Sequence, residues 1–273
     1  QRIPRIGKGL IPGKSIKKEK KKVLMEILSD YREKMNKFHC EKNIVVATNA
    51  LRIAANGKEI ANEISEKFSL NVIIVTGEEE AKLSFLGAVS EYNNEKNVVV
   101  IDIGGGSTEL IFGKGDQIYF KNSFPVGVVS LTEKYLKHDP PLEEEIKKLR
   151  FILKTKFSEI PGKNFTPEAA IAIAGTPTTL ACIQKRLHEF DEQAIEGSFL
   201  QLNELEKLIN ELSGLKKNKI LELYKSVVKG REDVLLAGTI ILFEIMNMLK
   251  VDKVIVSTKG IRYGAVLGYL IKG

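Results

Sequence analysis

The feature that most constrains the fold of this chain is an alternation of short Val/Ile runs with helical stretches. Apolar runs at residues 43–48, 71–75 and 97–103 are separated by segments with helical patterning at 50–68 and 78–91. Continuous apolar runs are typical of strands that are covered on both faces of a sheet. The first half of the chain therefore predicts an α/β fold.

The chain does not enter a helix after its third Val/Ile run. The glycines at 104–106 are followed by strand-like segments at 108–112 and 117–121, with a Gly-Lys-Gly-Asp turn between these two segments. This pattern predicts a β-hairpin, so a glycine loop at this place lies between strands and not at the start of a helix.

The second half repeats the theme of strand, glycine-containing turn and helix. Pro140-Pro141 separates two helical segments and is the candidate break between domains. We predict two domains, at residues 1–123 and 124–273. The other expected elements are strands at 169–174 and 253–257, and helices at 127–137, 142–158, 202–212, 217–229, 231–250 and 261–271.

Composition predicts a globular protein of the cytoplasm. The 273 residues suffice for two domains, and the 43% hydrophobic content is ordinary. Two cysteines, Cys40 and Cys182, argue against a disulfide framework and fit a reducing cytosol. The three histidines lack cysteines at metal-ligand spacing, which argues against a zinc site. No signal peptide is visible, and the longest apolar stretch, 234–246, predicts a buried helix and not a membrane span.

The chain is basic, with a net charge of +7, and a basic surface attracts acidic partners. Six lysines fall between residues 14 and 22, at the start of an expected helix. The run is either a surface that steers polyanions or only the solvated face of a helix. The sequence leaves both interpretations open.

The motif with the most chemistry is the segment 99–110, VVIDIGGGSTEL. Three glycines bring several backbone N–H groups close to an anion, and Ser107 and Thr108 add hydroxyl donors. Asp102, at the end of the expected strand, is placed to hold a hydrated Mg²⁺, and Glu109 is a second carboxylate within reach. The alternative is a glycine-rich turn with an incidental aspartate.

Two further segments follow expected strands, where ligands bind in open α/β sheets. Glu78, Glu79 and Glu80 begin a helix, where its dipole stabilises acids, but one of them could instead orient a water. Arg52 begins the preceding helix and could bind phosphate through its bidentate fork. The alternative for Arg52 is a surface pair with Glu59 or Glu63.

The segment 174–179, AGTPTT, is a third candidate. A Gly/Thr turn at a helix N-terminus can bind an anion. The alternative is a plain helix start, with Thr176 as the N-cap and Pro177 at the first helical position.

Together these motifs resemble the exopolyphosphatase / guanosine pentaphosphate phosphatase (Ppx/GppA) family. The family's first phosphate loop, in an N-terminal β-hairpin of about 30 residues, does not occur in the sequence, and residues 2–10 look like the stretch that follows this hairpin. Lys259 and Tyr263 stand where the family often has other residues. The matching segments occur in the family's order: ATNALR (47–52), VTGEEEAKLSFLGA (75–88), VVVIDIGGGSTELIFGKG (98–115), IAIAGTPTTLA (171–181), GREDVLLAG (230–238) and VIVSTKGIRYGAVLGYL (254–270).

The resemblance implies an α/β fold of the actin-like ATPase (ribonuclease H-like) superfold, with two domains around a cleft. It also implies roles for particular residues. Glu80 matches the catalytic base, and Asp102 and Glu109 match the carboxylates linked to Mg²⁺. The phosphate-binding residues are matched by Arg52, Gly104, Gly105, Gly106, Ser107, Gly175 and Thr176.

The implied activity is release of terminal orthophosphate from inorganic polyphosphate, guanosine pentaphosphate or both, with Mg²⁺ as cofactor. A cytoplasmic enzyme of the stringent response follows from the same resemblance. It implies no nucleic-acid or membrane partner, and it leaves a homodimer open. Two alternatives remain: a sensor that binds guanosine tetraphosphate or polyphosphate without hydrolysis, and a kinase on the same superfold.

Overall fold

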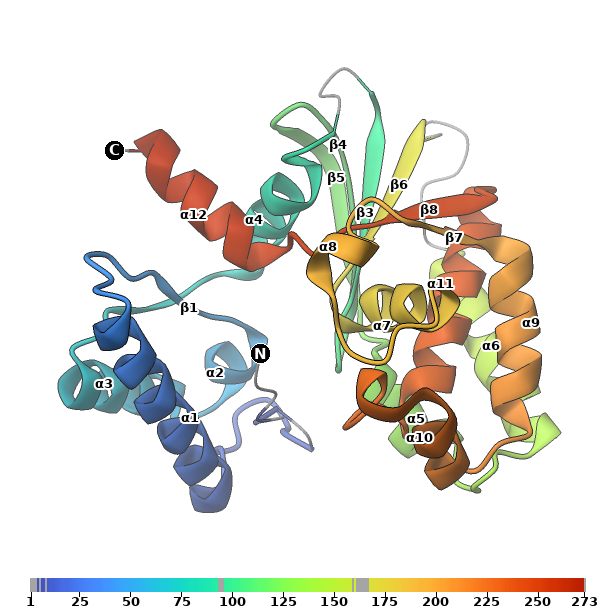
Figure 1. The fold of residues 1–273 in the computed structure, drawn as a ribbon, viewed down its shortest axis with the longest axis horizontal. Coiled ribbons are helices and arrows are strands. Elements are labelled where there is room, and N and C mark those ends of the chain that lie inside the picture. Colours follow the sequence, from blue (N-terminus) through green and yellow to red (C-terminus); the bar gives the residue numbers. More distant parts are fainter. Residues whose placement is uncertain are drawn as a thin grey trace. The chain divides into compact units, whose positions relative to one another are not determined.

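The structure is a computed structural model that describes residues 4, 6–7, 9–92, 96–158, 160 and 167–272. The chain divides into two compact units. Unit 1 comprises Gln1–Leu83 and Ala265–Gly273, and unit 2 comprises Ser84–Gly264. The chain leaves unit 1 within helix α4 (Gly77–Val89) and returns to it within helix α12 (Ile261–Lys272), both labelled in Figure 1. The stretch 2–10, which we compared with the segment after the family's hairpin, lies partly outside the described residues.

Unit 1 is built on two parallel strands, β1 (Val45–Ala47) and β2 (Val72–Ile74). Helix α3 (Gly57–Phe68) connects them and packs against β2. The expectation that both strands are buried on both faces is wrong, because Ile73 is 48% exposed and no residue of β1 or β2 is fully buried. Among the described residues this sheet has only two strands.

The predicted helix 50–68 is two helices, α2 (Asn49–Ile53) and α3. The chain is extended at Ala54, and Asn56 uses its side-chain amide to bond both backbone groups of Ile16. These bonds fix the segment before α1 (Lys18–Lys37) onto the break between α2 and α3. The core of unit 1 contains Ile16, Met25, Leu51, Ile60, Ala61, Ile64, Phe68 and Leu70.

Unit 2 contains a six-stranded sheet with the order β5-β4-β3-β6-β8-β7. The hairpin predicted after the glycines is confirmed, and β3 pairs antiparallel with β4 on one side and parallel with β6 on the other. The predicted domain boundary at 123/124 falls at the end of β5, inside this unit, so the compact units divide the chain elsewhere; the assignment of two actin-like domains stays a prediction. The strands are β3 (Val98–Ile103), β4 (Thr108–Lys114), β5 (Gln117–Phe124), β6 (Ala169–Ile173), β7 (Phe199–Gln201) and β8 (Lys253–Val256).

The helices of unit 2 gather around α11 (Leu235–Leu249), which contacts α5, α6, α7 and α9 (Figure 1). The buried helix predicted at 234–246 is thereby confirmed. Sequence patterning missed β7 and α8, which are three and four residues long and too short for a periodic signal. The other helices are α5 (Val128–Tyr135), α6 (Glu143–Phe157), α7 (Gly175–Gln184), α8 (Glu192–Ile195), α9 (Leu202–Ser213), α10 (Lys217–Tyr224) and a 3₁₀ turn (Lys225–Val227).

One buried charge lies in this helical layer. Glu244 of α11 is 1% exposed, and its Oε1 accepts a hydrogen bond from Nε of Arg150 on α6 at 2.8 Å. The Arg150 guanidinium also lies over the Phe243 ring, 4.7 Å from the ring centroid. Arg150 is 28% exposed, so this pair has one end in the core and the other at the surface.

Glu145 closes the start of α6. Its carboxylate accepts hydrogen bonds from the amides of Lys137 and Leu142, at 2.8 and 2.9 Å, and lies 3.0 Å from Nδ1 of His138. Burial raises the pKa of Glu145, but these bonds outweigh it and lower the pKa to about 2. Glu145 therefore ties the loop before α6 to the first turn of the helix.

Over the stretches that the structure describes, every helix is too short or too polar to traverse a lipid bilayer.

Candidate functional site

Arg52 and Glu80 form a direct ion pair in unit 1. Each follows a strand, β1 and β2 respectively, and the two strands run parallel, so both residues start at the same edge of the sheet. Nη1 of Arg52 donates to Oε2 of Glu80 at 2.8 Å and to the carbonyl oxygen of Val75 at 2.9 Å. The partner of Arg52 is therefore Glu80 and not Glu59 or Glu63.

The two side chains remain accessible, with 29% of Arg52 and 27% of Glu80 exposed. Because the Glu80 carboxylate stays open to solvent, a water can reach it, as the role of general base requires. The structure thus brings these two predicted site residues together.

Glu79, the residue before Glu80, caps the helix and does not contact Arg52 through any bond described above. The amide and hydroxyl of Thr76 donate to Oε2 of Glu79 at 2.8 and 3.0 Å, and the amide of Glu79 donates back to the Thr76 hydroxyl at 3.1 Å. This reciprocal pattern is a capping box that closes the start of α4. The helix-start interpretation therefore applies to Glu79, and it separates this residue from Glu80.

The glycine loop of unit 2, residues 104–106, is hydrogen-bonded to the start of α5. The amides of Val128 and Val129 donate to the carbonyls of Gly104 and Gly105 at 3.0 and 2.9 Å. In a trans peptide the carbonyl and the following N–H point in opposite directions. The amides of Gly105 and Gly106 therefore point away from α5, and both glycines are exposed. The loop presents these amides to an approaching anion.

Gly127 and Gly106 have opposite surroundings in this site. A Cβ on Gly127, the residue before α5, would lie 2.5 Å from the carbonyl oxygen of Gly105 and 2.5 Å from the carbonyl carbon of Gly106. By contrast, a Cβ on Gly106 would meet no protein atom within 4 Å. Gly127 is thus required by the protein's own packing, whereas the space beside Gly106 is open to a ligand.

The two carboxylates predicted to bind a metal ion lie opposite each other on the antiparallel strands β3 and β4. Asp102 of β3 is the direct cross-strand partner of Glu109 of β4, so their side chains share one face of the sheet. Ser84 of α4 donates to Oδ2 of Asp102 at 3.3 Å, and Ser123 of β5 donates to Oε1 of Glu109 at 2.7 Å. Like charges directly opposite each other are destabilising, and a shared cation removes this penalty.

The chemistry of this carboxylate pair fits a magnesium ion. Mg²⁺ takes oxygen ligands only, binds one or two carboxylates, and keeps several waters. Asp102 and Glu109 are both partly exposed, which leaves room for those waters. Among the described residues no group of three or more His, Cys, Asp or Glu side chains could hold a metal ion, so the two carboxylates would share the ion with water.

The start of α7 is a further candidate phosphate-binding element of unit 2. The helix begins at Gly175, after Ala174 with a φ of 73°, and no side chain caps its first turn. A positive φ with an extended ψ of −162° costs alanine about 1–3 kcal/mol, and such strain is concentrated at functional positions. The interpretation of Thr176 as N-cap is wrong, because the helix starts at Gly175, two residues before Pro177, and Thr176 is 6% exposed and packed against Gly238 of α11.

Arg231 also lies at the start of α7. A Cβ on Gly175 would overlap the guanidinium of Arg231, so only glycine permits this cation so close to the helix start. The glycine loop and this turn follow neighbouring parallel strands, since Asp102 of β3 pairs with Ile173 of β6. Both therefore lie at the same edge of the unit 2 sheet, where ligands bind in such sheets.

Lys259 and Tyr263, which depart from the family pattern, are engaged by the protein's own acids. Lys259 pairs with Glu91, which raises the pKa of Lys259. The hydroxyl of Tyr263 donates to Oε1 of Glu192 at 2.7 Å, and this bond raises the pKa of Tyr263. These contacts connect the chain at the start of α12 to the segment that follows α4 and to α8.

An exposed glycine loop beside two opposed carboxylates is typical of α/β proteins that handle phosphate. The model of the Ppx/GppA phosphatase family matches residues 1–272, and the chain belongs to this family. The predicted α/β fold of the actin-like ATPase superfold is confirmed by a solved structure, the Ppx/GppA family member of Aquifex aeolicus. That structure has a TM-score of 0.86 at 29% identity, covering 99% of this chain and 88% of the other.

Two curated relatives are each 30% identical to the chain. Exopolyphosphatase 2 of Mycobacterium tuberculosis aligns over 287 residues, which cover 97% of this chain and 86% of the relative. The bifunctional 3-dehydroquinate synthase/phosphatase of Fusobacterium nucleatum aligns over 272 residues, and the chain spans only 40% of that relative's length.

Sequence reasoning missed four residues that support the site: Ser84, Ser123, Gly127 and Arg231. Ser123 could have been found, because it lies in β5 and is the cross-strand partner of Glu109. Arg231 lies in a segment that carries the family resemblance, GREDVLLAG, but nothing in its sequence neighbourhood points to Gly175. Ser84 and Gly127 become visible only through tertiary contacts, with Asp102 and with the glycine loop respectively.

Proposed function

We propose that the chain is an exopolyphosphatase, a hydrolase that releases terminal orthophosphate from inorganic polyphosphate. The observation that carries this proposal is the pairing of Asp102 with Glu109 beside the outward-facing amides of Gly105 and Gly106. This arrangement suits a phosphoryl group that is bound together with a divalent cation. Membership in a phosphatase family and the similarity to an exopolyphosphatase favour hydrolysis over the sensor and the kinase.

In the proposed mechanism, the amides of Gly105, Gly106 and Ser107 bind the oxygens of the terminal phosphoryl group. The start of α7, with Gly175, Thr176 and Arg231, binds the next phosphate. Since the Thr176 hydroxyl packs against Gly238, the contribution of Thr176 comes from its backbone amide. Catalysis of this kind rests mainly on positioning and on neutralising charge.

Glu80 acts as the general base. It accepts a proton from a water, whose oxygen forms a bond to the terminal phosphorus while the bridging P–O bond breaks. The shortened chain leaves with its negative charge, and orthophosphate is released. Arg52 holds the Glu80 carboxylate in place through their 2.8 Å bond and adds a positive charge next to it.

Asp102 and Glu109 would hold Mg²⁺, which when bound neutralises charge on the phosphate oxygens. The protein itself orients these two carboxylates. Ser84 and Ser123 each donate to one of the two carboxylates and so orient them. Such supporting bonds matter because a ligand carboxylate that can rotate binds a metal less tightly.

The test is orthophosphate release by the full-length natural chain, with and without Mg²⁺. Long-chain polyphosphate, tripolyphosphate and guanosine pentaphosphate are compared at equal phosphate concentration. We expect Mg²⁺-dependent release from polyphosphate, and loss of that release in Asp102→Asn. Faster release from guanosine pentaphosphate would instead assign the nucleotide as substrate. Tight binding without any release would favour the sensor.

A further inference from the structure

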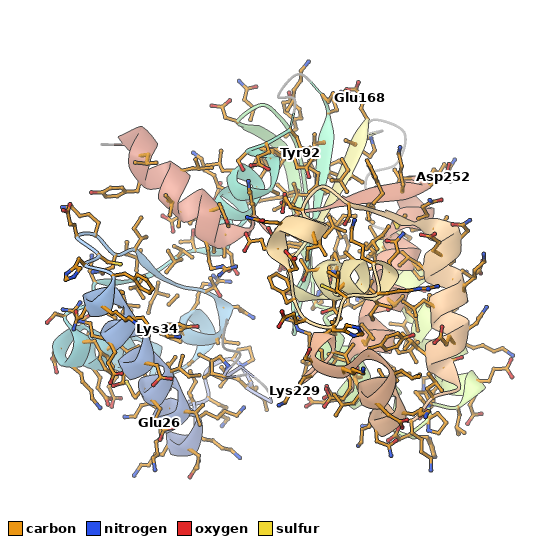
Figure 2. The ribbon with its side chains drawn as sticks, viewed as in Figure 1. Glu26, Lys34, Tyr92, Glu168, Lys229 and Asp252 are labelled. Atoms are coloured by element: carbon orange, nitrogen blue, oxygen red, sulfur yellow. The ribbon has the colours of Figure 1, made fainter. Side chains whose placement is uncertain are left out.

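Helices α6, α9 and α11 of unit 2 form a groove. Helix α11 packs against both α6 and α9 (Figure 2), and the groove lined by these three helices has a volume of about 700 Å³. Sites for small molecules have volumes of about 300–1,000 Å³. Glu244 lines the groove and lies about 9 Å farther along the axis of α11 than Gly238, which contacts the start of α7. The groove is therefore separate from the candidate phosphate site.

One carboxylate oxygen of Glu244 faces this groove without a donor. Glu244 is 1% exposed, and its Oε1 accepts the bond from Arg150 described above. Its Oε2 accepts no hydrogen bond from the described residues. In the part of the chain that the structure describes, every enclosed polar side-chain atom has a hydrogen-bond partner, so Oε2 is not enclosed and opens into the groove. A nearly buried carboxylate oxygen without a donor is costly, and a donor can reach this one only from the groove.

A second acceptor lies beside Glu244. Asn247 is three residues further along α11, so the two side chains are neighbours on the helix surface, and both line the groove. Nδ2 of Asn247 donates to the carbonyl oxygen of Phe243 at 3.1 Å, which leaves Oδ1 as an acceptor. The α11 side of the groove thus offers two acceptors, and an amino group has two N–H donors to match them.

The α6 side of the groove carries lysines and an exposed aromatic ring. Lys147, Phe151 and Lys154 line the groove at helical spacing, so they follow one another along one face of α6. Phe151 is 70% exposed, and Met248 of α11, which is 39% exposed, adds a second apolar side chain. Lys154 pairs with no carboxylate among the residues that the structure describes. The groove therefore has acceptors on one side, a cation on the other, and apolar surface available to a ring.

We propose that this groove binds a small aromatic molecule that carries an amino group at one end and an anionic group at the other. The amino group donates to Glu244 and Asn247. The ring packs against Phe151 and Met248, and the anionic group pairs with Lys154. Nucleotides with an amino-bearing base and aromatic amino acids share this chemistry. The inference does not rest on the proposed function, because the groove shares no residue with the candidate phosphate site.

The first probe is 5′-AMP, and its binding to the full-length chain is measured by isothermal titration calorimetry. Three incomplete probes are compared with it: adenosine lacks the anionic group, ribose 5-phosphate lacks the ring, and inosine 5′-monophosphate lacks the amino group. We expect 5′-AMP to bind with a Kd below about 1 mM and each incomplete probe to bind about tenfold more weakly. L-Tryptophan, titrated in the same way, represents the amino acids.

Four variants locate the binding site. Glu244→Gln keeps the size of the side chain and an acceptor for Arg150, but it replaces the oxygen in the groove with an NH₂ donor. Phe151→Ala and Lys154→Gln change exposed side chains, which keeps the fold intact. Each of these three variants should weaken binding of 5′-AMP about tenfold. Lys156→Gln is the matched control, because Lys156 is exposed in the same last turn of α6 but does not line the groove; its Kd should stay within about twofold.

Binding in the groove and hydrolysis can fail independently. Asp102→Asn should bind 5′-AMP as the wild type does, whether or not the wild type releases phosphate from polyphosphate. Binding of L-tryptophan instead of 5′-AMP, with the same response to the four variants, would support the site and assign it to an amino acid. The proposal is overturned if neither probe binds at about 1 mM. It is also overturned if Phe151→Ala and Lys154→Gln leave the binding unchanged.

Discussion

Replacing Gly127 with alanine tests whether the start of α5 holds the glycine loop in its active position. The new Cβ would lie 2.5 Å from the carbonyl groups of Gly105 and Gly106, whereas carbon atoms in contact are about 3.5 Å apart. The loop therefore has to move by about 1 Å. A displacement of that size costs about 100-fold in rate, and overpacking of this kind costs about 1–3 kcal/mol of stability.

The assay is kcat/KM for phosphate release together with urea unfolding. Gly106→Ala is the informative partner, because its Cβ meets no protein atom within 4 Å. It should change stability by less than about 0.5 kcal/mol and yet lower kcat/KM, since the added methyl occupies the space next to the phosphate. Gly214→Ala, at the end of α9 and 3.8 Å from its nearest neighbour, controls for the substitution itself. Wild-type kcat/KM in both Gly127→Ala and Gly106→Ala would refute the assignment of the loop.

Three further predictions follow from contacts already described. Arg150→Met should cost about 3–5 kcal/mol, because it leaves the Glu244 carboxylate buried without its cation. Glu244→Gln should cost less, since Arg150 reaches solvent; the reverse order in urea unfolding would contradict this account. Ser84→Ala should raise the Mg²⁺ concentration for half-maximal activity about tenfold, and an unchanged Mg²⁺ titration would remove Ser84 from the support of Asp102. Glu145 has a pKa of about 2 in the fold, below its unfolded value of 4.5, so it stabilises the protein above pH 4.5. The difference in unfolding free energy between wild type and Glu145→Gln should therefore be full at pH 7 and shrink as the pH falls from 4.5 toward 2, whereas a constant difference would exclude this linkage.

The strand and helix pattern was largely predictable, because each long element carries its own periodic signal. The exceptions have physical causes. The helix predicted at 50–68 breaks at Ala54 because Asn56 bonds Ile16, a contact across 40 residues that no local pattern reveals. The burial predicted for β2 fails at Ile73 because burial depends on neighbouring elements and not on the strand's own sequence.

The sequence predicted which residues form the candidate site and which strand or helix carries each of them, but not their contacts. Asp102 and Glu109 were named from their flanking glycines, and the structure adds that they are direct cross-strand partners. The choice among three consecutive glutamates could not be made from local pattern, because it depends on Thr76 capping with Glu79 and on the reach of Arg52. Supporting residues such as Arg231 depend on the tertiary fold alone.

The measurement that tests the central claim most directly is the rate of phosphate release from long-chain polyphosphate by Glu80→Gln, compared with Glu79→Gln. The two substitutions are isosteric and adjacent, but only Glu80 is proposed to accept the proton of the attacking water. The account predicts that Glu80→Gln lowers kcat by about 10²–10⁴-fold with KM changed only a few-fold, and that Glu79→Gln keeps most of the activity. Equal losses in the two variants, or full kcat in Glu80→Gln, would contradict it.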